Sequence, residues 1–232
     1  MQTIIFIILF LYIILILKYA IGWLNFDAIS VADFTPKVSV VIAMRNEENE
    51  IYRLLNNLKA QLYPNDKLEF IVVNDHSTDE TLKLLQGLEG RLDNLRVINL
   101  PCGTFGKKNA ILKAVELARG DIILSTDADC SFNPYWVKTM VAYFNDKKIK
   151  LVSGPVSFHY QKGLFYSLQN LEFISLIGSG AGAIGSGTPI FCNGANMAYR
   201  KDIFLQVNNF ATDVSASAAA AGRDRGARCA RT

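Results

Sequence analysis

A chain of 232 residues, half of them hydrophobic, is long enough to form one sizeable domain and an additional segment. The formal net charge of +3 is small, and the sequence has no Lys/Arg-rich stripe with interleaved aromatic residues, so we expect no nucleic-acid partner. The four cysteines lack C-x-x-C spacing, which argues against a zinc site or a redox pair and fits a reducing compartment.

The N-terminal stretch, residues 3–24, is almost wholly apolar and is long enough to cross a hydrocarbon core of about 30 Å. A cleaved signal peptide would need a basic start, which the first three residues do not supply. We therefore predict an uncleaved, single-pass transmembrane anchor over residues 1–25 and a linker over residues 26–37. The nearest basic residues lie on its C-terminal side: Lys18, Lys37 and Arg45. This asymmetry predicts that the following domain is cytoplasmic, at the cell membrane.

From residue 38 onward, apolar runs typical of strands alternate four times with helical patterns. The expected strands are residues 38–43, 68–73, 95–100 and 121–126. The expected helices are residues 47–61, 77–88 (beginning with a capping box, Ser77 to Glu80), 107–119 and 133–144. Such alternation predicts an α/β fold: a doubly wound, mostly parallel sheet with helices on both faces.

The pattern then changes. Residues 150–158 are strand-like and residues 163–177 are helical. Residues 178–187 contain too many glycines for a stable helix, so we expect a flexible or close-packed segment there. A short helix is expected over residues 201–207.

Two carboxylates, Asp127 and Asp129, directly follow the fourth expected strand. Ligands of open α/β sheets bind beyond the carboxyl ends of the strands. Carboxylates this close repel each other and favour a cation, and a hard divalent metal prefers such oxygen ligands while keeping positions open for a diphosphate. A D-x-D sequence alone also fits a polar turn after a strand.

Polar residues follow the other strands as well. Residues 44–47 follow the first strand without a G-x-G-x-x-G fingerprint, which argues against an NAD enzyme. Asp75 ends the second strand, where it either accepts hydrogen bonds from a base or ribose or caps a helix, although Ser77 can fill that second role. Lys107 opens a helix and suits either a phosphate or a solvated basic turn. His76 stays open between a structural and a catalytic role.

Five segments in chain order resemble the family 2 glycosyltransferases with the GT-A fold: VSVVIAMRNEE (38–48), VVNDHSTDET (72–81), GKKNA (106–110), GDIILSTDAD (120–129) and GANMAYR (194–200). The resemblance covers about residues 38–210. It implies a GT-A-like domain and inverting transfer of a sugar from a nucleotide-diphosphate donor, usually a UDP-sugar. The N-terminal anchor is similar to that of the membrane-bound members.

The resemblance also implies roles for single residues. The donor-binding residues would be Ala43, Arg45, Glu47, Asp75, Lys107 and Asp127. Gly194, Ala195 and Asn196 would line the sugar and acceptor side. Asp129, together with Asp127, would bind Mg²⁺ or Mn²⁺.

After residue 210 the sequence departs from the family, which continues to an acidic pair that supplies the general base and to further membrane helices. Residues 211–232 consist largely of Ala, Arg and Ser and contain no such pair. We therefore predict a truncated or frame-shifted product with an incomplete domain over residues 38–210, a disordered tail and an unassigned catalytic base.

Two other functions stay open: a catalytically impaired nucleotide-sugar-binding subunit, which the missing base favours, and a sugar nucleotidyltransferase. The second class would need a Gly-rich basic loop after the first strand, and residues 45–47 match that poorly. The acceptor is open between a lipid, a saccharide and a protein.

Overall fold

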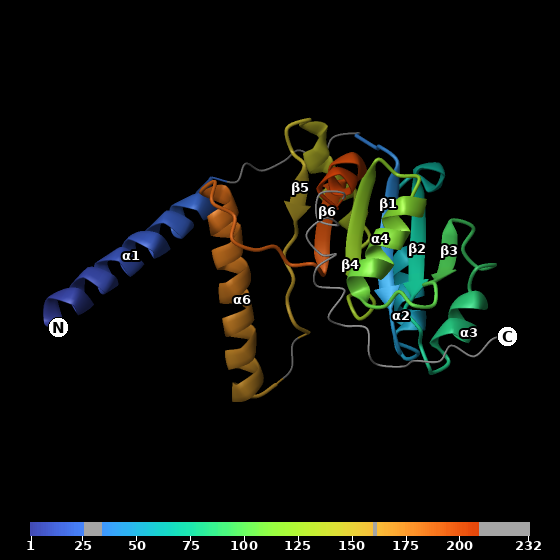
Figure 1. The fold of residues 1–232 in the computed structure, drawn as a ribbon, viewed down its shortest axis with the longest axis horizontal. Coiled ribbons are helices and arrows are strands. Elements are labelled where there is room, and N and C mark those ends of the chain that lie inside the picture. Colours follow the sequence, from blue (N-terminus) through green and yellow to red (C-terminus); the bar gives the residue numbers. More distant parts are fainter. Residues whose placement is uncertain (26–33, 160–161, 209–232) are drawn as a thin grey trace. The chain divides into compact units, whose positions relative to one another are not determined.

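The computed structural model describes residues 1–25, 34–159 and 162–208 (Figure 1). The chain divides into two compact units: Met1–Ser30 with Ser153–Met197, and Val31–Val152 with Ala198–Thr232. Most of the predicted linker and the whole predicted tail over residues 211–232 lie outside the described residues.

Six strands form one sheet in the order β3-β2-β1-β4-β6-β5 (Figure 1). The strands are β1 (Val38–Met44), β2 (Leu68–Asn74), β3 (Leu95–Asn99), β4 (Ile122–Asp127), β5 (Leu151–Ser153) and β6 (Asn196–Arg200). β1 pairs in parallel with β2 and β4, and β2 pairs in parallel with β3. The crossover order confirms the predicted doubly wound, GT-A-like sheet.

Helices connect these strands, and a long helix precedes the sheet. They are α1 (Gln2–Leu24), α2 (Ile51–Lys59), α3 (Thr81–Gln86), α4 (Lys107–Leu117), α5 (Trp136–Ala142) and α6 (Leu164–Gly185), with 3₁₀ turns at Asn65–Lys67 and Tyr143–Asn145. Residues 201–208 are also helical, as predicted.

Helices cover both faces of the sheet. Val40 and Ile42 of β1 belong to one buried hydrophobic cluster with Leu54 of α2 and Val141 of α5. Val41 is equally buried but points to the opposite face, because successive strand side chains alternate. On that face α4 contacts β1 and β2. The centre of the sheet is therefore buried on both faces, beneath the loops that follow its strands.

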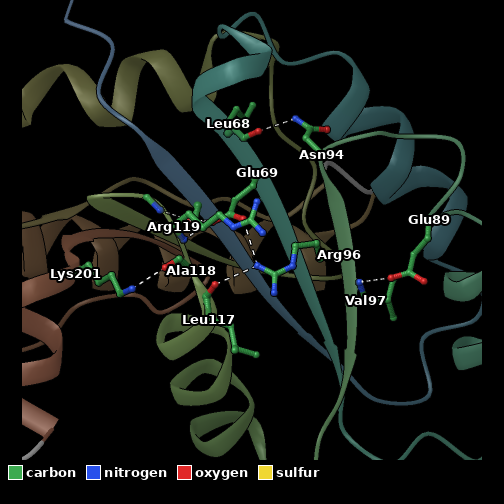
Figure 2. A network of polar contacts seen from close by, with 12 residues as sticks. Leu68, Glu69, Glu89, Asn94, Arg96, Val97, Leu117, Ala118, Arg119 and Lys201 are labelled. Atoms are coloured by element: carbon green, nitrogen blue, oxygen red, sulfur yellow. Dashed lines mark hydrogen bonds and ion pairs between the residues drawn. The ribbon is translucent and has the colours of Figure 1, made fainter.

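A network of polar contacts ties the amino ends of the strands together (Figure 2). The carboxylate of Glu69 on β2 accepts hydrogen bonds from Ser39 Oγ (2.6 Å) and from the backbone N–H of Arg119, and it pairs with Arg96 at 3.5 Å. Ser39 is fully buried and accepts a hydrogen bond from Gly120 N at 2.8 Å. This network therefore stabilises the end of the sheet opposite to the acidic pair.

We predict that Glu69→Ala lowers the free energy of unfolding by about 2–3 kcal/mol, because it leaves the Ser39 hydroxyl and the Arg119 amide without their acceptor. Urea unfolding of the detergent-solubilised chain measures this. Glu116→Ala is the matched control, since Glu116 is an exposed residue paired with Lys113, and it is expected to change stability by less than about 0.5 kcal/mol. Equal losses in the two variants would contradict the prediction.

The glycine-rich segment is helical up to Gly185, so the expectation that its glycines prevent a stable helix was wrong. The segment is helical despite its glycines because α6 packs closely against α1. Close packing was the second alternative that the sequence left open. A Cβ atom on Gly22 would overlap the carbonyl oxygen of Gly182, and one on Gly182 would overlap the backbone of Tyr19. The two helix backbones therefore approach each other at positions where only glycine fits.

Helix α1 has a mean hydropathy of 2.9 over an 18-residue window that is not buried, and by length and composition it can cross a membrane. A signal sequence near an N-terminus meets the same criteria. In the described part of the chain no other helix does so.

One strand is shorter than predicted. β5 ends at Ser153, whereas the sequence pattern extends to residue 158. Pro155 lacks a backbone N–H, so it cannot donate to the ladder; Gly154, just before it, donates a hydrogen bond to Asn196 O at 2.8 Å.

Candidate functional site

The carboxyl ends of three parallel strands lie side by side. Ala43 of β1 is in register with Val73 of β2 on one side and with Asp127 of β4 on the other. Arg45 and Glu47 follow the end of β1, and Asp75 follows the end of β2. Together with Ala43 and Asp127, five of the residues singled out from the sequence therefore come to one edge of the sheet.

Two loops at this edge, residues 45–48 after β1 and residues 77–81 after β2, bind each other directly. The hydrogen bonds run from Asn46 N to Ser77 Oγ (3.0 Å), from Glu47 N to Thr81 Oγ1 (2.8 Å), from Thr78 N to Asn46 Oδ1 (2.8 Å) and from Glu80 N to Glu48 Oε2 (3.0 Å). Asn46 and His76 have positive φ angles of 56° and 55°, which turn the chain sharply out of each strand. We call this arrangement the loop clamp.

The loop clamp explains why two helices begin later than predicted. α2 begins at Ile51 and not at residue 47, and α3 begins at Thr81 and not at residue 77. The predicted capping box is not formed, since Ser77 Oγ accepts its hydrogen bond from the neighbouring loop. Residues 46–48 and 77–80 satisfy one another's backbone groups, so they are not available for a first helical turn.

Asp75 is almost completely buried, with 4% of its surface exposed. Its Oδ2 atom accepts a hydrogen bond from Gly106 N at 2.9 Å, at the start of α4, so Asp75 does not cap the helix that follows it. Its Oδ1 atom is buried and has no hydrogen-bond partner among the described residues. A buried acceptor without a partner costs about 1–3 kcal/mol, which a ligand N–H or O–H would recover.

The acidic pair spans the end of β4, at Asp127, and the tight turn that follows it, at Asp129. The carboxylate of Asp127 forms an ion pair with Lys107, the first residue of α4. The intervening Ala128 is buried, and Cys130 N donates a hydrogen bond to Asp127 O at 3.3 Å. Asp129 is exposed. The turn is thus anchored in the core and presents one exposed carboxylate beside a lysine–aspartate pair.

Negative charge accumulates at this edge. Burial raises the pKa of the Glu47 carboxyl above its ordinary value, and the charges of Asp129, Glu50, Asp79 and Asp127 raise it further. Such a field attracts a cation.

The residues present fit a hard divalent metal that is shared with a substrate. Within residues 1–25, 34–159 and 162–208, no group of three or more His, Cys, Asp or Glu side chains is arranged to hold a metal. Mg²⁺ typically uses one or two protein carboxylates and completes its shell with water and substrate phosphates. Asp129, with Asp127 once it is released from Lys107, would therefore be sufficient protein ligands for an ion of that kind.

We predict that Glu47→Gln stabilises the metal-free chain at pH 7.5, by less than about 1 kcal/mol. The raised pKa of Glu47 means that its ionisation destabilises the folded state once the pH exceeds that pKa, and glutamine does not ionise. Below about pH 4 both folded and unfolded chains carry the protonated acid, and the difference should disappear. Urea unfolding in EDTA at the two pH values measures this, with Glu116→Gln as the exposed control. A difference that does not change with pH would contradict the electrostatic explanation.

Gly194, Ala195 and Asn196 belong to the other compact unit, at the start of β6. Ala195 N donates a hydrogen bond to Asn193 Oδ1 at 2.9 Å, and Asn196 Nδ2 donates one to Pro155 O at 2.9 Å. This turn is therefore fixed within its own unit by side-chain amides.

Sequence reasoning left His76 open and missed other residues of this edge. The His76 ring packs edge to face against Phe105 with centroids 4.5 Å apart, which is a structural contact. Asn46, Thr81 and Arg53 were not singled out. The signal for Asn46 was its type, since asparagine is enriched among the non-glycine residues that have positive φ.

Residues 39–207, which make up most of the chain, match the family model described as Glycosyl transferase family 2. The chain belongs to glycosyltransferase family 2. The resemblance read from the five sequence segments is thereby confirmed.

Curated relatives from this family span several organisms. Glycosyltransferase AglE of Haloferax volcanii is 32% identical over 130 residues, which are 55% of this chain and 42% of that protein. Beta-monoglucosyldiacylglycerol synthase of Nostoc sp. is 31% identical over 142 residues, 61% of this chain and 30% of that protein. The chain thus matches less than half the length of these glycosyltransferases.

Solved structures share the fold. The mannosyltransferase PcManGT from Pyrobaculum calidifontis, in complex with GDP-Man and Mn²⁺, superposes with a TM-score of 0.65 at 24% identity over 83% of this chain and 54% of that chain. Staphylococcus aureus TarS 1–349, in complex with UDP-GlcNAc, superposes with a TM-score of 0.51 at 24% identity over 74% of this chain and 47% of that chain. At this identity the likeness establishes the fold of the family 2 domain.

Proposed function

We propose that this chain binds a nucleoside-diphosphate sugar, with a UDP-sugar as the preferred donor, and transfers the sugar with inversion to an acceptor hydroxyl with the help of Mg²⁺ or Mn²⁺. The membership in glycosyltransferase family 2 supports the reaction class. The donor, the metal and the stereochemistry are proposals for this chain.

The unpartnered Oδ1 atom of Asp75 is the observation that carries the proposal. It is an acceptor in a buried position at the carboxyl edge of the sheet, where ligands of α/β sheets bind. The imide N–H of uracil is a matching donor. Asp75 would thus hold the base, while the backbone and side chains of Ala43, Arg45 and Glu47 on the neighbouring strand end would border the nucleoside.

Lys107 and the acidic pair would hold the diphosphate. Lys107 opens α4, where backbone N–H groups and the helix dipole favour anions. Asp129 and Asp127 would hold the metal, and a bound Mg²⁺ or Mn²⁺ would stabilise the negative charge on the leaving diphosphate. In this arrangement Lys107 would leave Asp127 for a phosphate oxygen when the donor binds.

The acceptor side and the membrane attachment are further parts of the proposal. Gly194, Ala195 and Asn196 would line the sugar and acceptor side. Helix α1 would anchor the chain, and the basic residues on its C-terminal side support a cytoplasmic domain. The acceptor class stays open between a lipid, a saccharide and a protein.

Calorimetry of the full chain in detergent, with UDP and GDP in Mn²⁺ and in EDTA, tests donor binding, and a radiolabelled sugar-transfer assay tests catalysis. We expect UDP to bind, and to bind more tightly with Mn²⁺. Binding without transfer would favour the catalytically impaired subunit. Absence of UDP binding, or release of pyrophosphate from a nucleoside triphosphate and a sugar phosphate, would contradict the proposal.

A further inference from the structure

Arg53 of α2 reaches the turn that carries the acidic pair. Its Nη2 atom donates a hydrogen bond to the backbone carbonyl oxygen of Asp129 at 2.6 Å. The same guanidinium forms an ion pair with the carboxylate of Glu50, one helical turn earlier. A charge-assisted bond of this length to a carbonyl is a strong restraint on the backbone that it holds.

Arg53 acts from a rigid base. The inward residues of α2 are all buried in the core: Ile51, Leu54, Leu55 and Leu58. The other end of the acidic turn is fixed by buried Ala128. Asp129 is exposed, and its carbonyl bond to Arg53 ties this residue's backbone to the sheet-packed helix.

We propose that Arg53 is a positioning residue for the metal-binding carboxylate of Asp129, and that Glu50 in turn orients Arg53. This inference rests on the proposed function. Because Arg53 fixes the Asp129 carbonyl, the side chain of Asp129 has fewer orientations available. Its carboxylate is therefore already oriented when a cation binds. Groups that orient a metal ligand without touching the metal commonly contribute 10- to 100-fold to metal affinity.

The alternative is that Arg53 only fastens α2 to the loop and supports the fold. The two roles differ in what they change. A fold-supporting contact affects thermal stability and all nucleotide binding alike. A positioning contact affects the enhancement by metal, defined as the Kd for UDP in EDTA divided by the Kd for UDP in Mn²⁺.

The test measures this enhancement by calorimetry for the full chain in detergent and for the variants Arg53→Met and Arg53→Lys, with melting temperatures alongside. We expect Arg53→Met to reduce the enhancement by about 10-fold or more while the Kd in EDTA stays unchanged. Lysine can donate one charge-assisted bond to the same carbonyl, so Arg53→Lys should retain most of the enhancement. Lys59→Met, an exposed charge removal on the same helix, is the matched control and should have no effect.

Several outcomes would overturn the inference. An unchanged enhancement in Arg53→Met would refute it, because Asp129 would then need no orienting partner. An equal loss of UDP affinity in EDTA and in Mn²⁺ would refute it as well. If Arg53→Met does not fold, Glu50→Gln decides, with a smaller reduction of the enhancement expected and no reduction refuting the inference. A wild-type chain that binds no UDP would refute the proposed function itself.

Discussion

Replacing Asp75 with asparagine is expected to weaken UDP binding by about 30- to 150-fold, equivalent to about 2–3 kcal/mol. Both carboxylate oxygens are needed as acceptors, because Oδ2 is bound by Gly106 N and Oδ1 is proposed to meet the base N–H. Asparagine has one acceptor oxygen, so its amide N–H₂ must face either Gly106 N–H or the base N–H. Calorimetry with UDP in EDTA isolates this effect from the metal.

The control for this variant is Asp66→Asn, which makes the same change at an exposed position of the 3₁₀ turn before β2. It should bind UDP like the wild type. The proposed role of Asp75 would be refuted by a folded Asp75→Asn chain with wild-type affinity, since such a result would mean that no ligand donor meets Oδ1.

Replacing Asp129 with asparagine is expected to reduce the enhancement of UDP affinity by Mn²⁺ by more than about 100-fold, beyond the range for a residue that only orients a ligand. Asp129 supplies the exposed carboxylate of the pair, whereas Asp127 already neutralises Lys107. The amide keeps the shape but removes the charge that a divalent cation requires. The measurement is the ratio of UDP dissociation constants in EDTA and in Mn²⁺.

Asp121→Asn is the matched control, because Asp121 is exposed and lies just before the amino end of β4, at the opposite end of the same strand. Its ratio should equal that of the wild type. If Asp129→Asn leaves Mn²⁺-supported UDP affinity untouched, the proposed metal site is wrong.

The strands and the polar residues that follow them were predictable from the sequence because each signal was local. Buried apolar runs gave β1, β2 and β4 to within a residue or two, and each run ended in polar residues. Parallel strands end at one edge, so the approach of Asp75 and Asp127 followed without any knowledge of side-chain packing.

The details of the site were not predictable because they depend on contacts between distant segments. Ser77 and Glu80 satisfy the spacing of a capping box, yet Ser77 bonds to Asn46 across 31 positions of sequence. Arg53 binds the carbonyl of a residue 76 positions away, and backbone acceptors leave no mark in the sequence. The i, i+3 spacing of Glu50 and Arg53 allows an ion pair, but nothing in that spacing points to the third partner.

The glycines of α6 illustrate the same limit. Helix propensity counts each glycine against a helix, by about 1 kcal/mol relative to alanine. Gly182 stands where the backbone of Tyr19 leaves no room for a Cβ atom, so tertiary packing overrides that preference. A sequence pattern distinguishes a flexible segment from a closely packed one only when the packing partner is known.

The loop clamp has a consequence for the speed and the cost of recognition. Fixing the backbone of a mobile loop costs about 1–2 kcal/mol of conformational entropy for each residue. Residues 45–48 and 77–81 already bind one another through their own amides and hydroxyls, so a nucleotide that binds there, as proposed, would not have to order them. Binding of the proposed donor would then need no slow rearrangement of these two loops, and more of the contact energy would remain as affinity.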